Sequence, residues 1–241
     1  MVNIQKAAVI GCGFVGSTIA YTMMQKGLFS EMVLLDANKA KAEGEAMDIS
    51  HGLPFTHAMD IYAGEYEDIA DASVVIITAG ANQKPGETRL DLVQKNAAIM
   101  RSIIKEIKRV NCEGILLIVS NPVDILTEVA LRESGFPKER VIGSGTVLDT
   151  ARLKYIISEK LDVDSRNVHA FIVGEHGDSE LAAWSCANIY GIKLQDFAKM
   201  RGYEHFAQDM EEVYKGVRDS AYEIIERKGA TYYGIGMAAE K

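Results

Sequence analysis

A histidine lies between two glycines in the second half of the chain, in the segment GEHGD at residues 174–178. The ring of His176 titrates near neutral pH, so it can both donate and accept a proton under physiological conditions. The flanking glycines predict exposed backbone of unusual conformation, which suits a packing side chain poorly. An ordinary loop histidine is the alternative, and the motif taken alone favours it over a catalytic residue.

A carboxylate and a guanidinium lie three residues apart, at Asp149 and Arg152, in a segment that is predicted to be helical. At this spacing the two side chains share one face of the helix and form a pair. Spacing alone favours a surface ion pair, which contributes about 0–1 kcal/mol to stability.

The polar segment QKPGETR, residues 83–89, follows a predicted strand and precedes a predicted helix. Its composition is that of a loop. Doubly wound sheets bind ligands at the carboxyl ends of their strands, so its position also predicts a lid over a site. Asn121, in the segment SNP at the end of the next strand, is either a turn residue or a hydrogen-bonding group that faces a cofactor.

The pattern G-x-G-x-x-G occurs once near the start of the chain, as Gly11, Gly13 and Gly16. It follows a predicted strand and opens a predicted helix, where glycines allow a tight turn and close approach of a pyrophosphate to the helix N-terminus. Asp36 ends the next strand, and its carboxylate can accept hydrogen bonds from ribose hydroxyls and repel a 2′-phosphate. The motif predicts an NAD site. A glycine turn with a capping aspartate and no ligand is the alternative.

In the first half of the chain, alternating strands and helices must position the glycine motif, Asp36, the polar segment at 83–89 and Asn121. Apolar, β-branched segments predict strands, and amphipathic segments between them predict helices. The predicted strands are residues 7–10, 32–35, 74–78 and 115–119, and the predicted helices are residues 15–25, 39–49, 90–110 and 123–133. This alternation indicates an α/β fold with a doubly wound parallel sheet of the Rossmann type and right-handed crossovers.

The second half has a different pattern, with predicted helices at 149–161 and 204–227 and a predicted strand at 168–173. We expect a dinucleotide-binding domain at residues 1–143 and a smaller α+β substrate domain at residues 144–241.

Composition excludes several classes of function. Of the 241 residues 25% are charged and 48% are hydrophobic, which is typical of a folded globular protein. The net charge of −8 speaks against nucleic-acid binding. The cysteines at 12, 112 and 186 fit neither a disulfide framework nor a metal site, so we expect no metal and a reducing, cytoplasmic compartment. The apolar segment at residues 6–10 is too short for a signal peptide or a membrane span.

Taken together, these motifs resemble the lactate/malate dehydrogenase family. The matching segments run through the whole chain in the order of the family: 11–16, Asp36, Ala79-Gly80, 86–89, 120–124, 148–152 and 174–178. Their combination is far more specific than any single motif. The resemblance therefore overturns the structural alternatives given above.

The resemblance implies the reduction of a 2-keto acid by NADH and the reverse oxidation of a 2-hydroxy acid. His176 would protonate the ketone oxygen, and Asp149 would hold its ring and stabilise the imidazolium. Arg152 would bind the substrate carboxylate in a bidentate pair, and Arg89 would polarise the carbonyl. Asn121 would hydrogen-bond at the reacting centre and beside the nicotinamide.

The resemblance implies further binding residues. Thr231 would line the substrate pocket, and Ile235 would line the nicotinamide pocket. The cofactor-binding set that it implies is Gly11, Gly13, Phe14, Val15, Gly16, Asp36, Thr78, Ala79, Gly80, Asn121 and Ile235.

Gln83 occupies the lid position that faces the variable end of the substrate in the family. Malate dehydrogenases have arginine there, to pair with a second carboxylate. Because a neutral glutamine would leave that carboxylate unpaired in a closed site, the resemblance favours lactate and pyruvate. Malate, longer 2-hydroxy acids, or NAD binding without catalysis are the alternatives.

Regulation and assembly are implied by the resemblance as well. Many bacterial members bind fructose 1,6-bisphosphate at a subunit interface, through a histidine and an arginine; here the two positions are His169 and Lys154. A lysine attracts phosphate as a point charge. We expect a homo-oligomer that has no nucleic-acid or membrane partner. Family members continue beyond the segment that corresponds to residues 232–236, so we expect the C-terminal part of the substrate domain to be missing.

Overall fold

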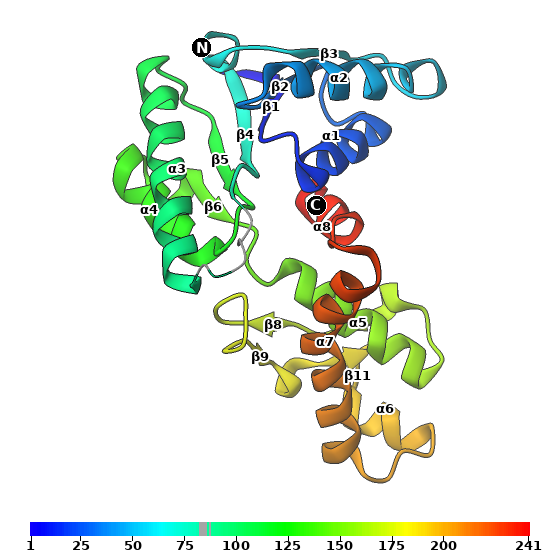
Figure 1. Cartoon of the computed structure of the whole chain (residues 1–241). Coiled ribbons are helices and arrows are strands. Elements are labelled where there is room, and N and C mark those ends of the chain that lie inside the picture. Colours follow the sequence, from blue (N-terminus) through cyan, green and yellow to red (C-terminus); the bar gives the residue numbers. More distant parts are fainter. Residues whose placement is uncertain (82–85, 87) are drawn as a thin grey trace. The chain divides into compact units, whose positions relative to one another are not determined.

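The computed structural model describes residues 1–81, 86 and 88–241, and the chain divides into two compact units (Figure 1). Unit 1 comprises Met1–Ser144 together with Tyr232–Lys241, and unit 2 comprises Gly145–Thr231. The predicted domains, 1–143 and 144–241, place the C-terminal segment in the second domain. In the structure that segment packs within unit 1. The predicted lid residue Gln83 lies outside the described residues.

Unit 1 is built on a six-stranded parallel sheet with the order β3-β2-β1-β4-β5-β6. The strands are β1 (Asn3–Ile10), β2 (Glu31–Leu35), β3 (Asp60–Ala63), β4 (Ala72–Ile77), β5 (Ile115–Ile118) and β6 (Val141–Gly143). The strand order reverses between β1 and β4, and ligands bind at such a switch point in open α/β sheets. The doubly wound fold predicted from the sequence is confirmed.

Helices cover both faces of this sheet because its strands are apolar on both sides. On β1, Val9 faces one buried cluster while Ala8 and Ile10 face the other, as the two-residue period of a strand requires. The Val9 side is covered by α1 (Phe14–Lys26), α2 (Lys39–Ser50) and α8 (Tyr233–Glu240). The opposite side is covered by α3 (Arg89–Arg109) and α4 (Val123–Ser134) (Figure 1).

A capping box fixes the start of α3. The hydroxyl of Thr88 accepts a hydrogen bond from the backbone N–H of Asp91, and the Asp91 carboxylate accepts one from the Thr88 backbone. Arg89 is therefore the first residue of the helix. The sequence had indicated a loop through residue 89, so the helix begins one residue earlier than predicted.

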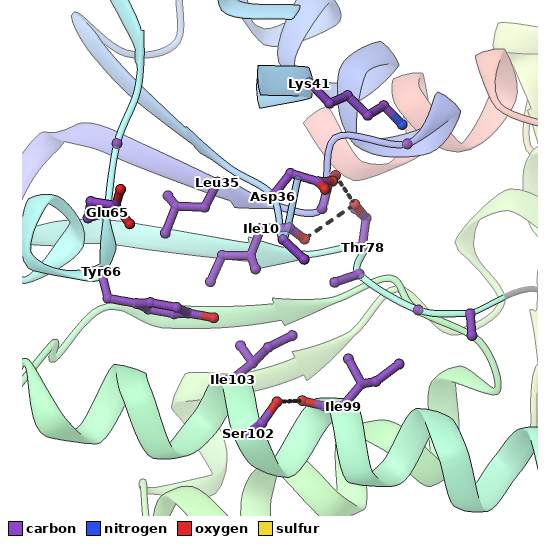
Figure 2. A pocket seen from close by; sticks show the side chains of 17 residues that line it. Ile10, Leu35, Asp36, Lys41, Glu65, Tyr66, Thr78, Ile99, Ser102 and Ile103 are labelled. Carbon is purple, nitrogen blue, oxygen red and sulfur yellow. Dashed lines mark hydrogen bonds between the residues drawn. The ribbon is translucent and has the colours of Figure 1, made fainter. Parts of the chain in front are cut away.

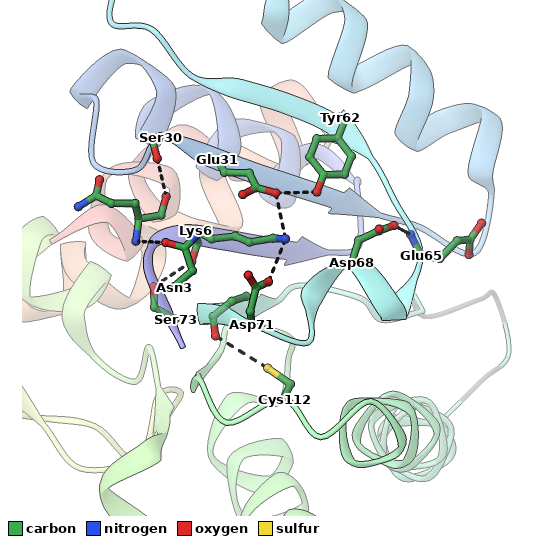
Figure 3. A network of polar contacts seen from close by, with 12 residues as sticks. Asn3, Lys6, Ser30, Glu31, Tyr62, Glu65, Asp68, Asp71, Ser73 and Cys112 are labelled. Carbon is green, nitrogen blue, oxygen red and sulfur yellow. Dashed lines mark hydrogen bonds and ion pairs between the residues drawn. The ribbon is translucent and has the colours of Figure 1, made fainter. Parts of the chain in front are cut away.

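A buried lysine ties together the sheet strands β1 and β2 and the turn before β4 (Figure 3). The ammonium of Lys6, which is 6% exposed, lies 2.9 Å from Oε1 of Glu31 and 3.0 Å from Oδ1 of Asp71. Tyr62 donates a hydrogen bond of 2.7 Å to the same Glu31 oxygen. Burial alone would lower the pKa of Lys6, but its two carboxylate partners raise it instead.

Unit 2 packs three helices around several very short strands. The helices are α5 (Val147–Leu161), α6 (Leu194–Met200) and α7 (Phe206–Lys228). The strands are β7 (Val168–His169), β8 (Ile172–Val173), β9 (Leu181–Ala182), β10 (Asn188–Ile189) and β11 (Ile192–Lys193). The apolar faces of α5 and α7 meet in a single core with α6 and these strands. This explains the helical periodicity of both segments.

The single strand predicted at 168–173 is wrong. The segment divides into β7, which pairs with β10 in a three-stranded sheet, and β8, which pairs with β9 in a two-stranded sheet. Ala170 is buried but Phe171 is exposed. A short, mostly apolar segment thus contributes to two different sheets. Among the residues that the structure describes, no helix combines the length and apolar character needed to cross a membrane.

Candidate active site

A cavity of about 670 Å³ opens in unit 1 at the carboxyl ends of β1, β2 and β4 (Figure 2). Its walls include Gly11 and Gly13 after β1 and Asp36 after β2. Thr78, Ala79 and Gly80, which follow β4, line it as well. The cavity therefore lies at the switch point of the sheet, where the fingerprint predicts the dinucleotide.

The three glycines of the fingerprint are needed for different reasons. A Cβ on Gly16 would lie 1.9 Å from the carbonyl oxygen of Gly11, and one on Gly11, whose φ is +103°, would lie 2.5 Å from the nitrogen of Ala79. These two glycines are required by packing alone. A Cβ on Gly13 would meet nothing within 4 Å, although Gly13 lines the cavity at the start of α1. The open space at Gly13 fits the approach of a phosphate to a helix N-terminus.

Asp36 is held in place by backbone groups from two turns. Its Oδ2 accepts a hydrogen bond of 2.7 Å from the N–H of Cys12, and its Oδ1 accepts one of 2.8 Å from the N–H of Asn38. A carboxylate oxygen has room for more than one donor. The carboxylate on the cavity wall therefore fits the ribose hydroxyls of NAD, and its negative charge opposes a 2′-phosphate.

Some residues of the predicted cofactor set lie elsewhere. Phe14 is exposed and stacks on Tyr232, with ring centroids 5.2 Å apart. Val15 and Ile235 are half-buried against the core between the sheet and α1. Asn121 is exposed, and its backbone carbonyl accepts a hydrogen bond of 2.9 Å from the side chain of Asn96. None of these residues is in the cavity lining that the described part of the chain defines.

The opposite wall of the cavity consists of residues that sequence reasoning missed. Ile99, Ser102 and Ile103 of α3 and Tyr66 line it (Figure 2). The periodicity of α3 indicated an amphipathic helix. It did not indicate that one edge of the apolar face of this helix borders a cavity. Burial raises the pKa of Tyr66 to about 12, so its hydroxyl stays neutral at physiological pH.

Unit 2 brings together three of the residues that were predicted to handle substrate and proton. Nδ1 of His176 lies 2.5 Å from Oδ2 of Asp149, and Nη1 of Arg152 lies 2.8 Å from Oδ1 of the same carboxylate. Gly174 and Gly177, on either side of the histidine, have positive φ values of +99° and +147°, which glycine adopts without strain. The structure therefore groups the helix pair and the loop histidine around one carboxylate.

The electrostatics of this group favour a charged pair. Asp149 is 3% exposed, and although burial raises its pKa, the hydrogen bond from His176 and the charge of Arg152 lower it overall. The hydrogen bond to Asp149 raises the pKa of His176, and burial partly opposes this rise. A deprotonated Asp149 beside a readily protonated His176 is the arrangement that a general acid–base needs.

A further carboxyl group, which sequence reasoning missed, completes the cluster. Glu180 is 4% exposed, and its carboxylate oxygen, an oxygen of Asp149 and a ring nitrogen of His176 all lie within 4.8 Å of one another. Burial, reinforced by the charge of Asp149, raises the pKa of Glu180 to about 7. These residue types also occur at metal sites, but Arg152 already neutralises Asp149 here.

The remaining predicted residues are distributed over both units. Arg89 begins α3 and is exposed. Thr231 is half-buried at the end of unit 2. His169 is exposed on β7, and Lys154 is half-buried on α5. The roles of these four residues stay predictions.

The chain matches two family models in succession. Residues 5–143 match the NAD-binding domain of lactate/malate dehydrogenases, and residues 146–241 match their alpha/beta C-terminal domain. The L-lactate dehydrogenase of Acetivibrio thermocellus is 55% identical over 238 residues, which is 99% of this chain and 75% of that protein. The L-lactate dehydrogenase of Priestia megaterium is 56% identical over 97% of this chain and 73% of its own length.

Solved structures of lactate dehydrogenases are similar to this chain as well. A lactate dehydrogenase from a Medee basin deep-sea metagenome library, MGS-M5, has a TM-score of 0.96 and 54% identity, over 100% of this chain and 76% of that one. The minor L-lactate dehydrogenase of Enterococcus mundtii in its ligand-bound form has a TM-score of 0.94 and 48% identity, over 98% of this chain and 75% of its own. The chain thus spans about three quarters of these relatives, and it belongs to the lactate/malate dehydrogenase family.

Proposed function

We propose that this protein interconverts L-lactate and pyruvate, with NAD as the hydride carrier. The observation that carries the proposal is the single carboxylate of Asp149, which holds both His176 and Arg152 within hydrogen-bond distance. A proton donor and a guanidinium fixed side by side suit a substrate with a ketone next to a carboxylate. The relatives named above, which are L-lactate dehydrogenases, support the same reaction.

The cavity of unit 1 is the proposed NAD site. Gly11, Gly13 and the start of α1 would hold the pyrophosphate, and Asp36 would bind the adenosine ribose. Thr78, Ala79 and Gly80 would border the dinucleotide along β4. When bound, NADH supplies the hydride that reduces the keto carbon. Phe14, Val15, Gly16 and Ile235 would support this site through α1 and α8.

His176 would carry the proton of the reaction. Because Nδ1 is engaged by Asp149, Nε2 is the atom that would donate its proton to the ketone oxygen of pyruvate and take it back from the hydroxyl of lactate. Asp149 would fix the tautomer and stabilise the imidazolium. Both effects keep the acid form available near neutral pH, which agrees with the raised pKa of His176.

Other side chains would bind and polarise the substrate. Arg152 has donors beyond the one that pairs with Asp149, so it would bind the substrate carboxylate in a bidentate pair. Arg89 would stabilise the negative charge that develops on the carbonyl oxygen. Asn121 and Thr231 would complete the binding of substrate and nicotinamide.

Gln83 would select pyruvate over oxaloacetate, because a neutral amide leaves a second carboxylate unpaired.

We further propose a homo-oligomer in a reducing, cytoplasmic compartment, with fructose 1,6-bisphosphate as an effector at Lys154 and His169. An unchanged KM for pyruvate on addition of the bisphosphate would contradict the effector role.

NADH oxidation, followed with pyruvate and separately with oxaloacetate, tests the proposal. Strong preference for pyruvate supports it, and preference for oxaloacetate favours a malate dehydrogenase. NADH binding, measured by fluorescence, without turnover of either substrate would indicate a cofactor-binding module instead.

A further inference from the structure

Glu180 is a buried carboxyl group that the proposed mechanism does not use. It lies four positions after His176, in the loop that leads into β9, and only 4% of its surface is exposed. Together with Asp149, Arg152 and His176 it lines a small cavity of about 140 Å³ in unit 2. A carboxyl group is rarely buried unless it has a partner or a function, so its position requires an explanation.

The charges around Glu180 come from three elements of unit 2. Helix α5 contributes Asp149 and Arg152, and the loop contributes His176. Helix α7 contributes Arg218, whose charge favours the ionised carboxylate. The other ionisable groups that face the cavity are Asp178, from the loop, and Tyr222, from α7.

Packing keeps the Glu180 carboxyl next to the histidine. The hydroxyl of Tyr214, on α7, donates a hydrogen bond to the backbone carbonyl of Glu180 and so fixes its main chain. A carboxylate oxygen of Glu180 lies within 4.8 Å of a ring nitrogen of His176 and of an oxygen of Asp149. At this separation one unit charge changes the energy of another appreciably, even under strong screening.

We propose that Glu180 is a positioning residue whose ionisation sets the proton affinity of His176, so that the two groups titrate as a coupled pair. The proposal rests on the proposed role of His176 as the proton donor. A negative Glu180 stabilises the imidazolium, and a neutral Glu180 does not.

The charge balance of the cluster explains why the two ionisations are coupled. A neutral His176 beside a protonated Glu180 has the same total charge as an imidazolium beside a carboxylate. The buried cluster can therefore exchange one of these states for the other without burying additional net charge. Burial raises the pKa of Glu180 to about 7, and the hydrogen bond to Asp149 raises the pKa of His176. Two ionisable groups this close to each other titrate as a pair.

The direction of the effect follows from the sign of the charge. Reduction of pyruvate requires the protonated ring, so a carboxylate at Glu180 extends this activity to higher pH. Oxidation of lactate requires the neutral ring, so the same carboxylate moves the acid limb of that reaction to higher pH. A Glu180 that only filled space as a neutral acid would move neither limb.

Histidine NMR of the cofactor-free protein tests the coupling directly. The His176 ring signal, assigned with His176→Asn, is followed through a pH titration in the wild type, Glu180→Gln and Glu180→Asp. We expect Glu180→Gln to lower the titration midpoint of His176 by about 0.5–1 pH unit, the effect of one nearby charge in a screened site. Glu180→Asp, which keeps the charge, should stay close to the wild type. Glu211→Gln, which removes an exposed carboxylate from α7, is the matched control and should leave the midpoint unchanged.

The pH profile of pyruvate reduction provides the second readout. In Glu180→Gln the alkaline limb of kcat/KM should move to lower pH by the same interval, with activity about 3–10-fold lower above the midpoint. An unchanged His176 midpoint in Glu180→Gln overturns the proposal. If Glu180→Gln does not fold, Glu180→Asp and Glu180→Ala are compared instead. An equal shift of the His176 midpoint in these two variants would overturn the proposal, because only the aspartate keeps the charge. Absence of turnover in the wild type would defeat the proposed function, while the NMR titration would still decide the coupling.

Discussion

Nδ1 of His176 lies 2.5 Å from Oδ2 of Asp149, a carboxylate that pairs through its other oxygen with Arg152 at 2.8 Å. Asp149 is almost fully buried in the first turn of α5, so it cannot turn to follow either partner. One carboxylate therefore orients both the ring that would move the proton and the guanidinium that would bind the substrate.

Asp149→Asn should reduce the turnover of pyruvate by at least about 100-fold, because the amide neither stabilises the imidazolium nor fixes the tautomer. The alkaline limb of the pH profile should also move to lower pH, since the interaction that raises the pKa of His176 is lost. Steady-state kinetics over a pH series measure both effects. A variant with the wild-type profile would contradict the assigned role.

The same pair makes stability depend on pH. The raised pKa of His176 contributes stability that is fully present below its ordinary value of 6.5 and is lost as pH rises through the folded value. The lowered pKa of Asp149 contributes stability that is present above 3.8 and is lost as pH falls through its folded value. The difference in thermal unfolding between wild type and Asp149→Asn should therefore be largest between pH 3.8 and 6.5.

Arg152→Lys should chiefly weaken substrate binding. Lysine keeps the charge beside Asp149 but offers no planar fork for a carboxylate. We expect KM for pyruvate and Kd for oxamate to rise about 10–100-fold, as for the loss of one hydrogen bond to a charged group. NADH binding by fluorescence is the control and should not change. Oxamate binding equal to that of the wild type would show that Arg152 does not hold the substrate.

Two glycines of the fingerprint should respond differently to alanine. Gly16→Ala places a Cβ 1.9 Å from the Gly11 carbonyl and should destabilise the fold by about 1–3 kcal/mol. Gly13→Ala meets no protein atom within 4 Å, so unfolding by urea should be unchanged while NADH affinity falls about 10-fold. If Gly13→Ala binds NADH normally, the phosphates do not pass where the fingerprint places them.

The ion pairs of Lys6 with Glu31 and Asp71 should stabilise the fold and should have no effect on catalysis. Lys6→Met leaves the carboxylates of Glu31 and Asp71 without their cation, so we expect a loss of about 1–3 kcal/mol. The loss should decrease below about pH 4, as the carboxylates become protonated. Urea unfolding measures it, with the exposed Lys105→Met as the matched control. Equal stability of the two variants would show that the network contributes nothing.

Local patterns predicted the regular parts of the fold. The strands β1, β2, β4 and β5 each contain a run of apolar residues that are mostly buried, so their sequence alone identifies them. Short elements carry too little pattern: β6 has three residues, and the run at 168–173 pairs with two different sheets. Such pairing depends on distant partners that a sequence window does not contain.

The site was predictable where a motif encodes its chemistry. The fingerprint glycines and Asp36 form a pattern that predicts dinucleotide binding on its own. Asp149 and His176 were identified only through the resemblance of their segments to the family, because their local patterns favoured a surface ion pair and an ordinary loop histidine. Glu180 has no recognisable pattern, because a glutamate in a polar loop is ordinarily solvated. Its burial results from packing against residues of α7 such as Tyr214 and Arg218, which are more than thirty residues further along the chain, and only the fold reveals it.

The most direct test compares chemistry with cofactor binding in His176→Ala. We predict that kcat for pyruvate falls about 100–10,000-fold, the usual contribution of a general acid–base, while NADH affinity stays at the wild-type value. His205→Ala, which removes an exposed histidine of the same unit, should retain full activity. Near-normal turnover in His176→Ala would contradict the account, because the proton would then come from another group.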